Sequence, residues 1–215
     1  MRLRRALQAC VVVFLLAVPA LSFAQSSFEQ LLKAVNTGDV RTAADLLDKG
    51  LEPNTADPEG NTILMLAARG GYQEIVALLI DRKASVTRRS AHGDTALMFA
   101  CLKGHLPIAK LLVANGAQVK QDGWAPLHYA VFEGRTEVVK FLLEKGADKN
   151  VLAPNGFTPL MLAARGGHLE TARVLLYEDV DLYTKGPKGE TALAIATQRK
   201  SEELVTLLRR AGALE

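Results

Sequence analysis

Histidine and cysteine are among the residue types in this chain that could hold a metal ion or activate a nucleophile. The 215 residues include four histidines and two cysteines. His92 has no cysteine or histidine near it at the spacing that a zinc site requires. His105 and His168 each directly follow a glycine that we expect to end a helix. Their positions favour a structural role over metal binding or catalysis.

The remaining polar motifs also lack a catalytic pattern. The Arg-Gly-Gly triplets at 69–71 and 165–167 are typical of a helix end, not of a loop that cradles phosphate. The acidic pair Glu202 and Glu203 lies at a polar helix start, where carboxylates favour the helix dipole. The sequence contains no Walker loop, dinucleotide-binding fingerprint or nucleophile elbow. We therefore expect no enzyme, no catalytic residues, no cofactor and no metal.

The elements that carry these residues recur along the chain. The segment TILMLAARGGYQEIVALLI at 62–80 returns as TPLMLAARGGHLETARVLL at 158–176, with 11 of 19 positions identical. A shared motif begins at five glycines spaced 33, 30, 33 and 33 residues apart, namely Gly60, Gly93, Gly123, Gly156 and Gly189. A sixth, degenerate copy precedes them at 27–59. Such self-similarity predicts stacked units that bury a shared interface.

Each copy carries the signals of two short helices and a connecting turn. A threonine can cap the first helix in four copies, at Thr62, Thr95, Thr158 and Thr191. Pro126 and Pro159 suit its first position, where no amide partner is needed. Glycines suited to a left-handed backbone then end it, at Gly71, Gly104, Gly134 and Gly167. A second helix follows with apolar residues at helical spacing, and the chain then turns outward as a finger.

These motifs resemble the ankyrin repeat, whose 33-residue unit carries the signature Thr-Pro-Leu-His-x-Ala. The best matches are APLHYA at 125–130 and TPLMLAA at 158–164, supported by EVVKFLLEKGAD at 137–148. The resemblance covers nearly all of 27–215. It implies an all-α solenoid of stacked helix-turn-helix units with short β-hairpin fingers. It also implies structural roles for His128, in the fourth position of the turn, and for Cys101, at a small buried position.

The resemblance further implies which positions face the concave surface, where this family binds its partners. They are the residue before the capping threonine and the two residues before the glycine that ends the first helix. The candidate partner-binding residues are Trp124, Phe132, Phe157, Arg69, Lys103, Arg165, Glu133 and Asp94. Asn61, Glu190, Leu102, Gln198 and Arg199 occupy the same kinds of position.

Three of these candidates are large aromatic residues in neighbouring copies: Trp124, Phe132 and Phe157. The chain is only 6% aromatic, and Trp124 is its only tryptophan. If their side chains are exposed, they form an interface hot spot, because aromatic and arginine anchors dominate interface energies. If they fold back onto adjacent repeats, they are local packing. The sequence leaves both interpretations open.

The copies depart from the common pattern in three ways. The 30-residue spacing shortens the finger at 119–123, which predicts a step in the row of fingers. Lys83 and Asp179 replace a glycine seen in other copies, so a left-handed backbone would strain Lys83. We then expect Lys83→Gly to raise stability by up to about 1 kcal/mol. The turn histidine is also missing from most copies, which leaves its hydrogen bonds there without a donor or acceptor.

The first residues have the pattern of a secretory signal peptide. Arg2, Arg4 and Arg5 precede an apolar run to about Leu21, and small residues precede an expected cleavage site after Ala24. The run is shorter than the roughly 20 residues that a spanning helix needs, so we favour cleavage over a membrane anchor. The pattern predicts export, to the periplasm of a bacterium first and by secretion second.

Removing this segment changes the charge of the chain. The whole sequence has 26 basic and 23 acidic residues, and the segment 1–24 holds three arginines and no acid. The mature chain thus has equal numbers of both, which gives no evidence for nucleic-acid binding. Cys101 is then its only cysteine, so no intramolecular disulfide can form.

The sequence therefore predicts a signal peptide at 1–24 and an ankyrin-repeat domain at 25–215. Its repeats are expected at 27–59, 60–92, 93–122, 123–155, 156–188 and 189–215, the first and last being caps. We expect a monomer that binds another protein, with no nucleic acid and no membrane after cleavage. A secreted effector acting on a host protein and a periplasmic factor that binds many clients weakly remain alternatives.

Overall fold

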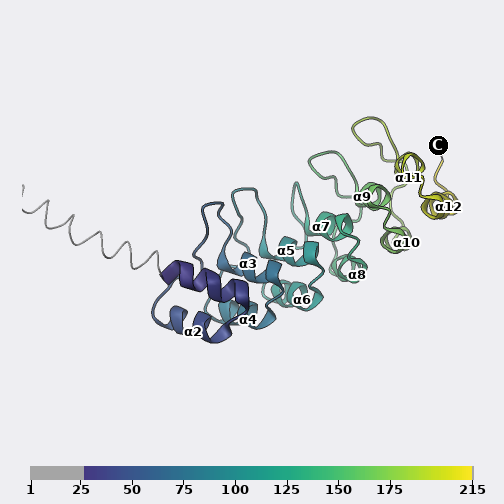
Figure 1. Cartoon of the computed structure of the whole chain (residues 1–215). Helices are drawn as coiled ribbons and strands as arrows, with labels where there is room; N and C mark the ends of the chain where they lie inside the picture. The colour runs from purple at the N-terminus through teal and green to yellow at the C-terminus, as the bar shows by residue number, and fades with distance from the viewer. Residues whose placement is uncertain (1–26, 215) are drawn as a thin grey trace, which may run out of the picture.

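The computed structural model describes residues 27–214, which form a stack of helix pairs in two rows (Figure 1). The inner row consists of the helix at 27–37, α3 (Ile63–Gly70), α5 (Ala96–Lys103), α7 (Pro126–Phe132), α9 (Pro159–Gly166) and α11 (Ala192–Gln198). The outer row consists of α2 (Val40–Asp48), α4 (Gln73–Asp81), α6 (Leu106–Ala114), α8 (Thr136–Glu144), α10 (Leu169–Tyr177) and α12 (Glu202–Arg210). The predicted signal peptide lies outside the described residues.

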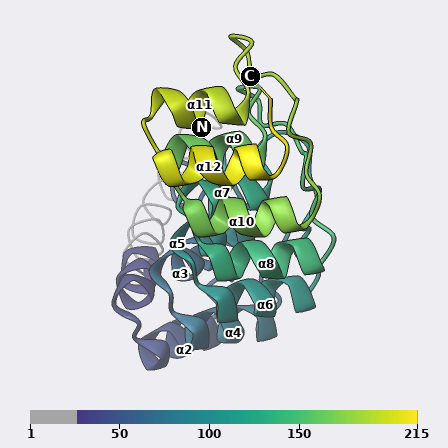
Figure 2. The ribbon, with the colours of Figure 1, turned by 90° about the vertical axis from the view of Figure 1, so that its right-hand side faces the viewer.

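Neighbouring units cover each other's apolar faces. Within the inner row α3 contacts α5, α5 contacts α7, α7 contacts α9 and α9 contacts α11. The outer helices α4 to α12 stack in the same order, as Figure 2 shows. The leucine of each shared motif is buried in all five copies: Leu64, Leu97, Leu127, Leu160 and Leu193. The all-α solenoid is confirmed, and its core is one continuous cluster that runs along the stack.

The predicted helix caps are present. The hydroxyls of Thr62, Thr95, Thr158 and Thr191 each accept a hydrogen bond from the backbone N–H three residues later, at 3.2–3.3 Å. Pro126 and Pro159 occupy the first positions of α7 and α9. Each cap satisfies an amide that has no partner within its own helix.

The structure accounts for the missing turn histidine in two of the four copies that lack it. In the copy that keeps it, His128 Nδ1 accepts the Ala125 N–H at 3.0 Å, and Nε2 lies 3.0 Å from the Val151 carbonyl. Because Nδ1 is an acceptor, the proton lies on Nε2, which donates to Val151. In two other copies a methionine sulfur takes over the first bond. Met65 Sδ accepts from the Thr62 N–H and Met98 Sδ from the Thr95 N–H, both at 3.3 Å.

Left-handed residues end the helices where the sequence predicts them. Gly71, Gly104, Gly134 and Gly167 have φ between 64° and 82°. Lys83 and Asp179 also have positive φ, at 66° and 57°, which confirms that both adopt a conformation suited to glycine. Lys200 shares this conformation with φ of 58°, which was not predicted.

The fingers are hairpin-shaped loops with little regular pairing. Among residues 27–214, the β pairing is the isolated antiparallel bridge between Ala56 and Thr62. Four fingers are closed by a main-chain bond spanning four residues, for example from Ser90 N–H to the Asp94 carbonyl at 2.9 Å. The short finger before α7 is narrower in Figure 1 and uses a side chain instead. There Gln121 Nε2 donates to the Trp124 carbonyl at 2.6 Å.

Side chains that follow the helix-ending residues tie four of the units to the one before them. Each reaches the last turn of the preceding inner helix, where carbonyls lack helical partners. The bonds run from Tyr72 to Asn36, from His105 to Arg69, from Arg135 to Leu102 and from His168 to Phe132, at 2.6–3.3 Å. The structural roles predicted for His105 and His168 are thus confirmed.

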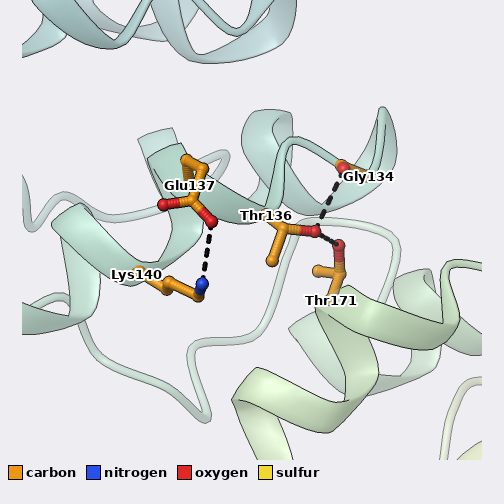
Figure 3. A network of polar contacts seen from close by, with 5 residues as sticks. All are labelled: Gly134, Thr136, Glu137, Lys140 and Thr171. Carbon is orange, nitrogen blue, oxygen red and sulfur yellow. Dashed lines mark hydrogen bonds and ion pairs between the residues drawn. The ribbon is translucent and has the colours of Figure 1, made fainter.

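The outer row has a polar tie of its own between α8 and α10. The Thr136 and Thr171 hydroxyls lie 2.9 Å apart, and Thr136 also donates to the Gly134 carbonyl at 3.4 Å (Figure 3). Because Thr171 is buried, its hydroxyl needs this partner. On the exposed side of α8, Lys140 pairs with Glu137 at 2.7 Å.

Candidate binding surface

The inner helices and the fingers together form the surface that we call the concave face. It consists of the fingers and the exposed sides of α3, α5, α7, α9 and α11. Four predicted residues are exposed near the ends of these helices: Arg69, Lys103, Glu133 and Arg165. Asp94, Trp124 and Phe157 are half-buried, where the fingers return to α5, α7 and α9. Phe132, at the end of α7, is 53% exposed.

The three aromatic candidates do not share one environment. The Trp124 ring meets His128 and Tyr129 edge-on, with centroids 5.6 and 6.1 Å apart, so it packs within its own repeat. Phe157 is covered by the Arg165 guanidinium, 5.6 Å above its ring. Only Phe132 presents most of its ring to solvent. The two interpretations that the sequence left open therefore apply to different residues.

Trp124 and Phe132 meet in one pocket. Leu102, Trp124, His128, Tyr129 and Phe132 enclose a volume of about 310 Å³ between α5, the short finger and α7. Phe157 and Arg165 instead line a separate, more polar hollow that reaches Glu190 and Gln198. The structure thus brings together two of the three aromatic candidates and places the third beside a different set of residues.

Sequence reasoning missed two aromatic residues on this surface. Phe99 and Tyr129 stand four residues after the capping position, where three other copies have buried Leu66, Leu162 and Ile195. The Tyr129 hydroxyl donates to the Asp94 carboxylate, and Arg69 lies 5.7 Å above the Phe99 ring. Burial and then the bond to Asp94 raise the pKa of Tyr129. The available signal was an aromatic residue replacing an aliphatic one in two adjacent copies.

Three acids at the predicted and equivalent positions of the concave face are bonded within the molecule, whereas the bases at these positions are not paired with acids. Asp94 accepts from Tyr129, Glu133 pairs with Arg135 at 3.6 Å, and Glu190 accepts the Lys188 N–H at 2.8 Å. Among residues 27–214, no carboxylate lies within ion-pair distance of Arg69, Lys103, Arg165 or Arg199. The face therefore offers positive charge around an apolar centre.

The groups that could do chemistry are occupied in the fold. Cys101 is fully buried, and burial raises the pKa of its thiol, which disfavours the reactive thiolate. His128 is buried with both ring nitrogens bonded to backbone atoms. Within the described part of the chain, no three His, Cys, Asp or Glu residues are grouped closely enough to hold a metal ion.

Comparisons with known proteins agree on the repeat. A family model described as ankyrin repeats, in three copies, matches residues 14–90, 31–121, 85–153 and 148–213. The chain is also similar to the crystal structure of the human ASB11 ankyrin repeat domain. The two are 25% identical with a TM-score of 0.81, over 86% of this chain and 84% of that one. No curated protein matches the sequence.

Proposed function

Because the chain belongs to the ankyrin-repeat family, whose stacked repeats are protein–protein interaction modules, we propose that it binds a partner protein through its concave face. The observation that carries this proposal is the apolar pocket at the centre of that face. Phe132 is the wall of this pocket that is most exposed. Arg69, Lys103 and Arg165 lie on the same face, and none of them forms an ion pair with a carboxylate of residues 27–214. Aromatic and arginine side chains contribute most of the energy at protein interfaces.

The proposed role is non-catalytic. Its support is that the histidines and the cysteine with a defined environment serve the fold. His105 and His168 bond to carbonyls of the preceding unit, His128 holds its own turn, and Cys101 packs in the core. Catalysis needs a nucleophile, a base and a charge-stabilising group in mutual contact. No such set is assembled by these residues.

We further propose that the protein works after export, in the periplasm. The support is the sequence at 1–24, with three early arginines, an apolar run and small residues before Ala24. Cell fractionation and the intact mass of the protein test this proposal. A periplasmic species that starts near Gln25 supports it, and an uncleaved cytoplasmic species contradicts it. Export into the medium would favour the effector alternative.

No helix within residues 27–214 combines the length and the hydropathy needed to cross a membrane.

Cross-linking in the producing cells, followed by affinity purification and mass spectrometry, tests the binding proposal. The wild type is compared with Phe132→Ala, which removes an exposed ring and leaves the core intact. Tyr177→Ala is the matched control, because Tyr177 is an aromatic residue on α10 with 90% exposure. We expect a partner that is retained by Tyr177→Ala and lost with Phe132→Ala.

Two other results would contradict the proposal. An equal loss of the partner in both variants would mean that the exposed ring at the pocket has no special role. Many weak partners that survive Phe132→Ala would favour the broad, chaperone-like alternative over a specific binding module.

A further inference from the structure

The pocket on the concave face has the size and chemistry of a site for one large apolar side chain. Its volume of about 310 Å³ is at the lower end of the range for small-molecule pockets. Leu102, Trp124 and Phe132 supply apolar walls. The polar groups of the other two walls are already bonded, the Tyr129 hydroxyl to Asp94 and the His128 ring nitrogens to backbone atoms. A polar guest would therefore gain few hydrogen bonds there.

The walls of this pocket are fixed before any partner arrives. Arg135 Nε donates to the Leu102 carbonyl at 3.2 Å, and His168 Nε2 lies 2.9 Å from the Phe132 carbonyl. Gln121 holds the Trp124 carbonyl at 2.6 Å. Each bond anchors the backbone of a pocket wall to another element. Such preorganisation lowers the entropy cost of binding, because the walls need not become ordered when the guest enters.

Positive charge lies on both sides of the pocket along the stack. The seventh residue after the capping position is Arg69 in α3, Leu102 in α5, Phe132 in α7 and Arg165 in α9. We call this line the Arg-Leu-Phe-Arg row. Its two central residues line the pocket, and an arginine stands one repeat beyond it at each end. These arginines lie over the Phe99 and Phe157 rings, which hold them on the face.

The spacing of this row sets the length of a matching segment. Packed helices lie 8–10 Å apart, so three repeat intervals separate the two arginines by about 24–30 Å. An extended chain advances about 3.3 Å per residue, so the row corresponds to roughly seven to nine residues. Acidic residues about four positions before and after a central apolar residue would then reach Arg69 and Arg165.

We propose that the partner binds as an extended acidic segment that inserts one large apolar side chain into this pocket. The carboxylates on either side of the inserted residue pair with Arg69 and Arg165, and Lys103 adds charge beside Leu102. Asp94, Glu133 and Glu190, the acids nearest this row, do not pair with these cations, because each is bonded to another group of the molecule. This inference rests on the proposed function and specifies the chemistry of the partner.

Trp124 makes the proposal directly measurable. It is the only tryptophan of the chain and it lines the pocket, so its fluorescence reports occupancy. The probe is a capped synthetic peptide of about nine residues, with a central Phe, Gly and Ser spacers, and Glu at both ends. One control peptide has Ala at the centre, and a second has Lys at both ends. We expect the first probe to shift the emission and each control to bind at least about tenfold more weakly.

Variants of the protein assign the effect to these residues, with calorimetry as the readout. Phe132→Ala should weaken binding of the probe at least about tenfold, and Tyr177→Ala should leave it unchanged. The double variant Arg69→Glu/Arg165→Glu should abolish the preference for acidic ends. Lys49→Glu is the charge control. Lys49 is an exposed residue that caps α2, and the equivalent position after α10 is occupied by Glu178.

The results separate this inference from the broader function. If the Ala-centred peptide binds as well as the Phe probe, the pocket does not take the side chain and the inference is wrong. Equal binding of the acidic and basic probes, or an unchanged affinity in the double arginine variant, would overturn its charge component. A partner that is lost from Phe132→Ala in cells, combined with no preference among the peptides, would refute the inference and leave the proposed function standing.

Discussion

His128 is the one residue that holds its turn with a group that titrates near neutral pH. Met65 and Met98 make the equivalent bond with sulfur, which does not titrate. Burial lowers the pKa of the His128 imidazole below its ordinary value of 6.5, although the bond to the Val151 carbonyl opposes this shift. The folded state therefore favours neutral His128, and the unfolded chain binds its proton more readily.

This difference predicts a loss of stability in mild acid. The unfolded state takes up the proton as the pH falls below about 6.5, whereas the folded state resists it, so the free energy of unfolding decreases. His128→Met should remove this part of the pH dependence. It should also lower stability near pH 8, where wild-type His128 is neutral, by losing the bond to Val151. Thermal unfolding of both proteins between pH 5 and 8 provides the measurement, and parallel pH profiles would refute the prediction.

Lys83 holds a backbone conformation that costs a non-glycine residue free energy. Its φ is 66°, whereas the equivalent Gly116 and Gly146 have φ of 94° and 81°. Lys83→Gly should raise the free energy of unfolding by up to about 1 kcal/mol, less the added entropy of the unfolded chain. Gly116→Ala makes the opposite change at the equivalent position and serves as the control, because a Cβ there meets no atom within 4 Å. It should lower stability, and urea unfolding compares the two. A less stable Lys83→Gly protein would contradict the argument.

The short finger differs from the other fingers as an element, because a side chain replaces its main-chain bond. Gln121→Ala should cost about 1 kcal/mol by leaving the Trp124 carbonyl without this donor. It should also speed hydrogen exchange at residues 119–125 and change the emission of Trp124. Gln118→Ala is the matched control, since Gln118 is an exposed glutamine on the same finger. Equal effects of the two substitutions would show that the Gln121 bond does not hold the finger.

The helices themselves were predictable from sequence because most copies carry the same local signals for the start and the end of a helix. Thr62, Pro159 and Gly71 act through their own backbone neighbourhood, so their roles can be identified without the fold. The 30-residue spacing also predicted the position of the short finger. The bond from Gln121 was not predictable, because it depends on the backbone path that the finger takes when it is three residues shorter. Lys200 was missed although comparison with the other copies marked it, because it occupies the position of Gly71, Gly104, Gly134 and Gly167.

At the scale of the whole molecule, the stack should open locally before it unfolds completely. Contacts join adjacent units, so stability is a sum over units and their interfaces. Cys101 is a buried probe of the central repeats. In the full chain carrying Cys10→Ser, we expect a thiol reagent to label Cys101 only after local opening. Leu112→Ala lies in the same repeat and Leu208→Ala in the last one, and both leucines are fully buried.

The two substitutions should therefore act differently on labelling. Each removes a buried leucine at a cost of about 2–5 kcal/mol, yet only Leu112→Ala weakens the unit that contains Cys101. We expect Leu112→Ala to accelerate labelling at least about tenfold more than Leu208→Ala does. The measurement is the labelling rate at low denaturant, followed by mass spectrometry. Equal acceleration would mean that the array unfolds as a single cooperative block.

For the concave face, the sequence predicts which residues occupy the surface positions but not which of their side chains are exposed. The positions of Trp124, Phe132 and Phe157 follow from the repeat, but their exposure depends on side chains of other units. Arg165 covers Phe157, whereas the ring of Phe132 has no such cover. Tyr129 lines the pocket because Leu102 of α5 and Trp124 of the short finger both lie beside it. Contacts between side chains of different repeats depend on how the repeats stack, so they cannot be predicted from the sequence of one repeat.

The short finger also bears on how such a molecule can be altered. The inner helices α5 and α7 pack as the other inner helices do, although the finger that connects α6 to α7 lacks three residues found elsewhere. The length of a finger can thus change without changing how the inner helices pack. An engineer could vary the length and composition of the short finger on either side of Gln121, whose bond to the Trp124 carbonyl would be kept, beside a preformed apolar pocket. A library built there would explore new recognition without redesigning the scaffold.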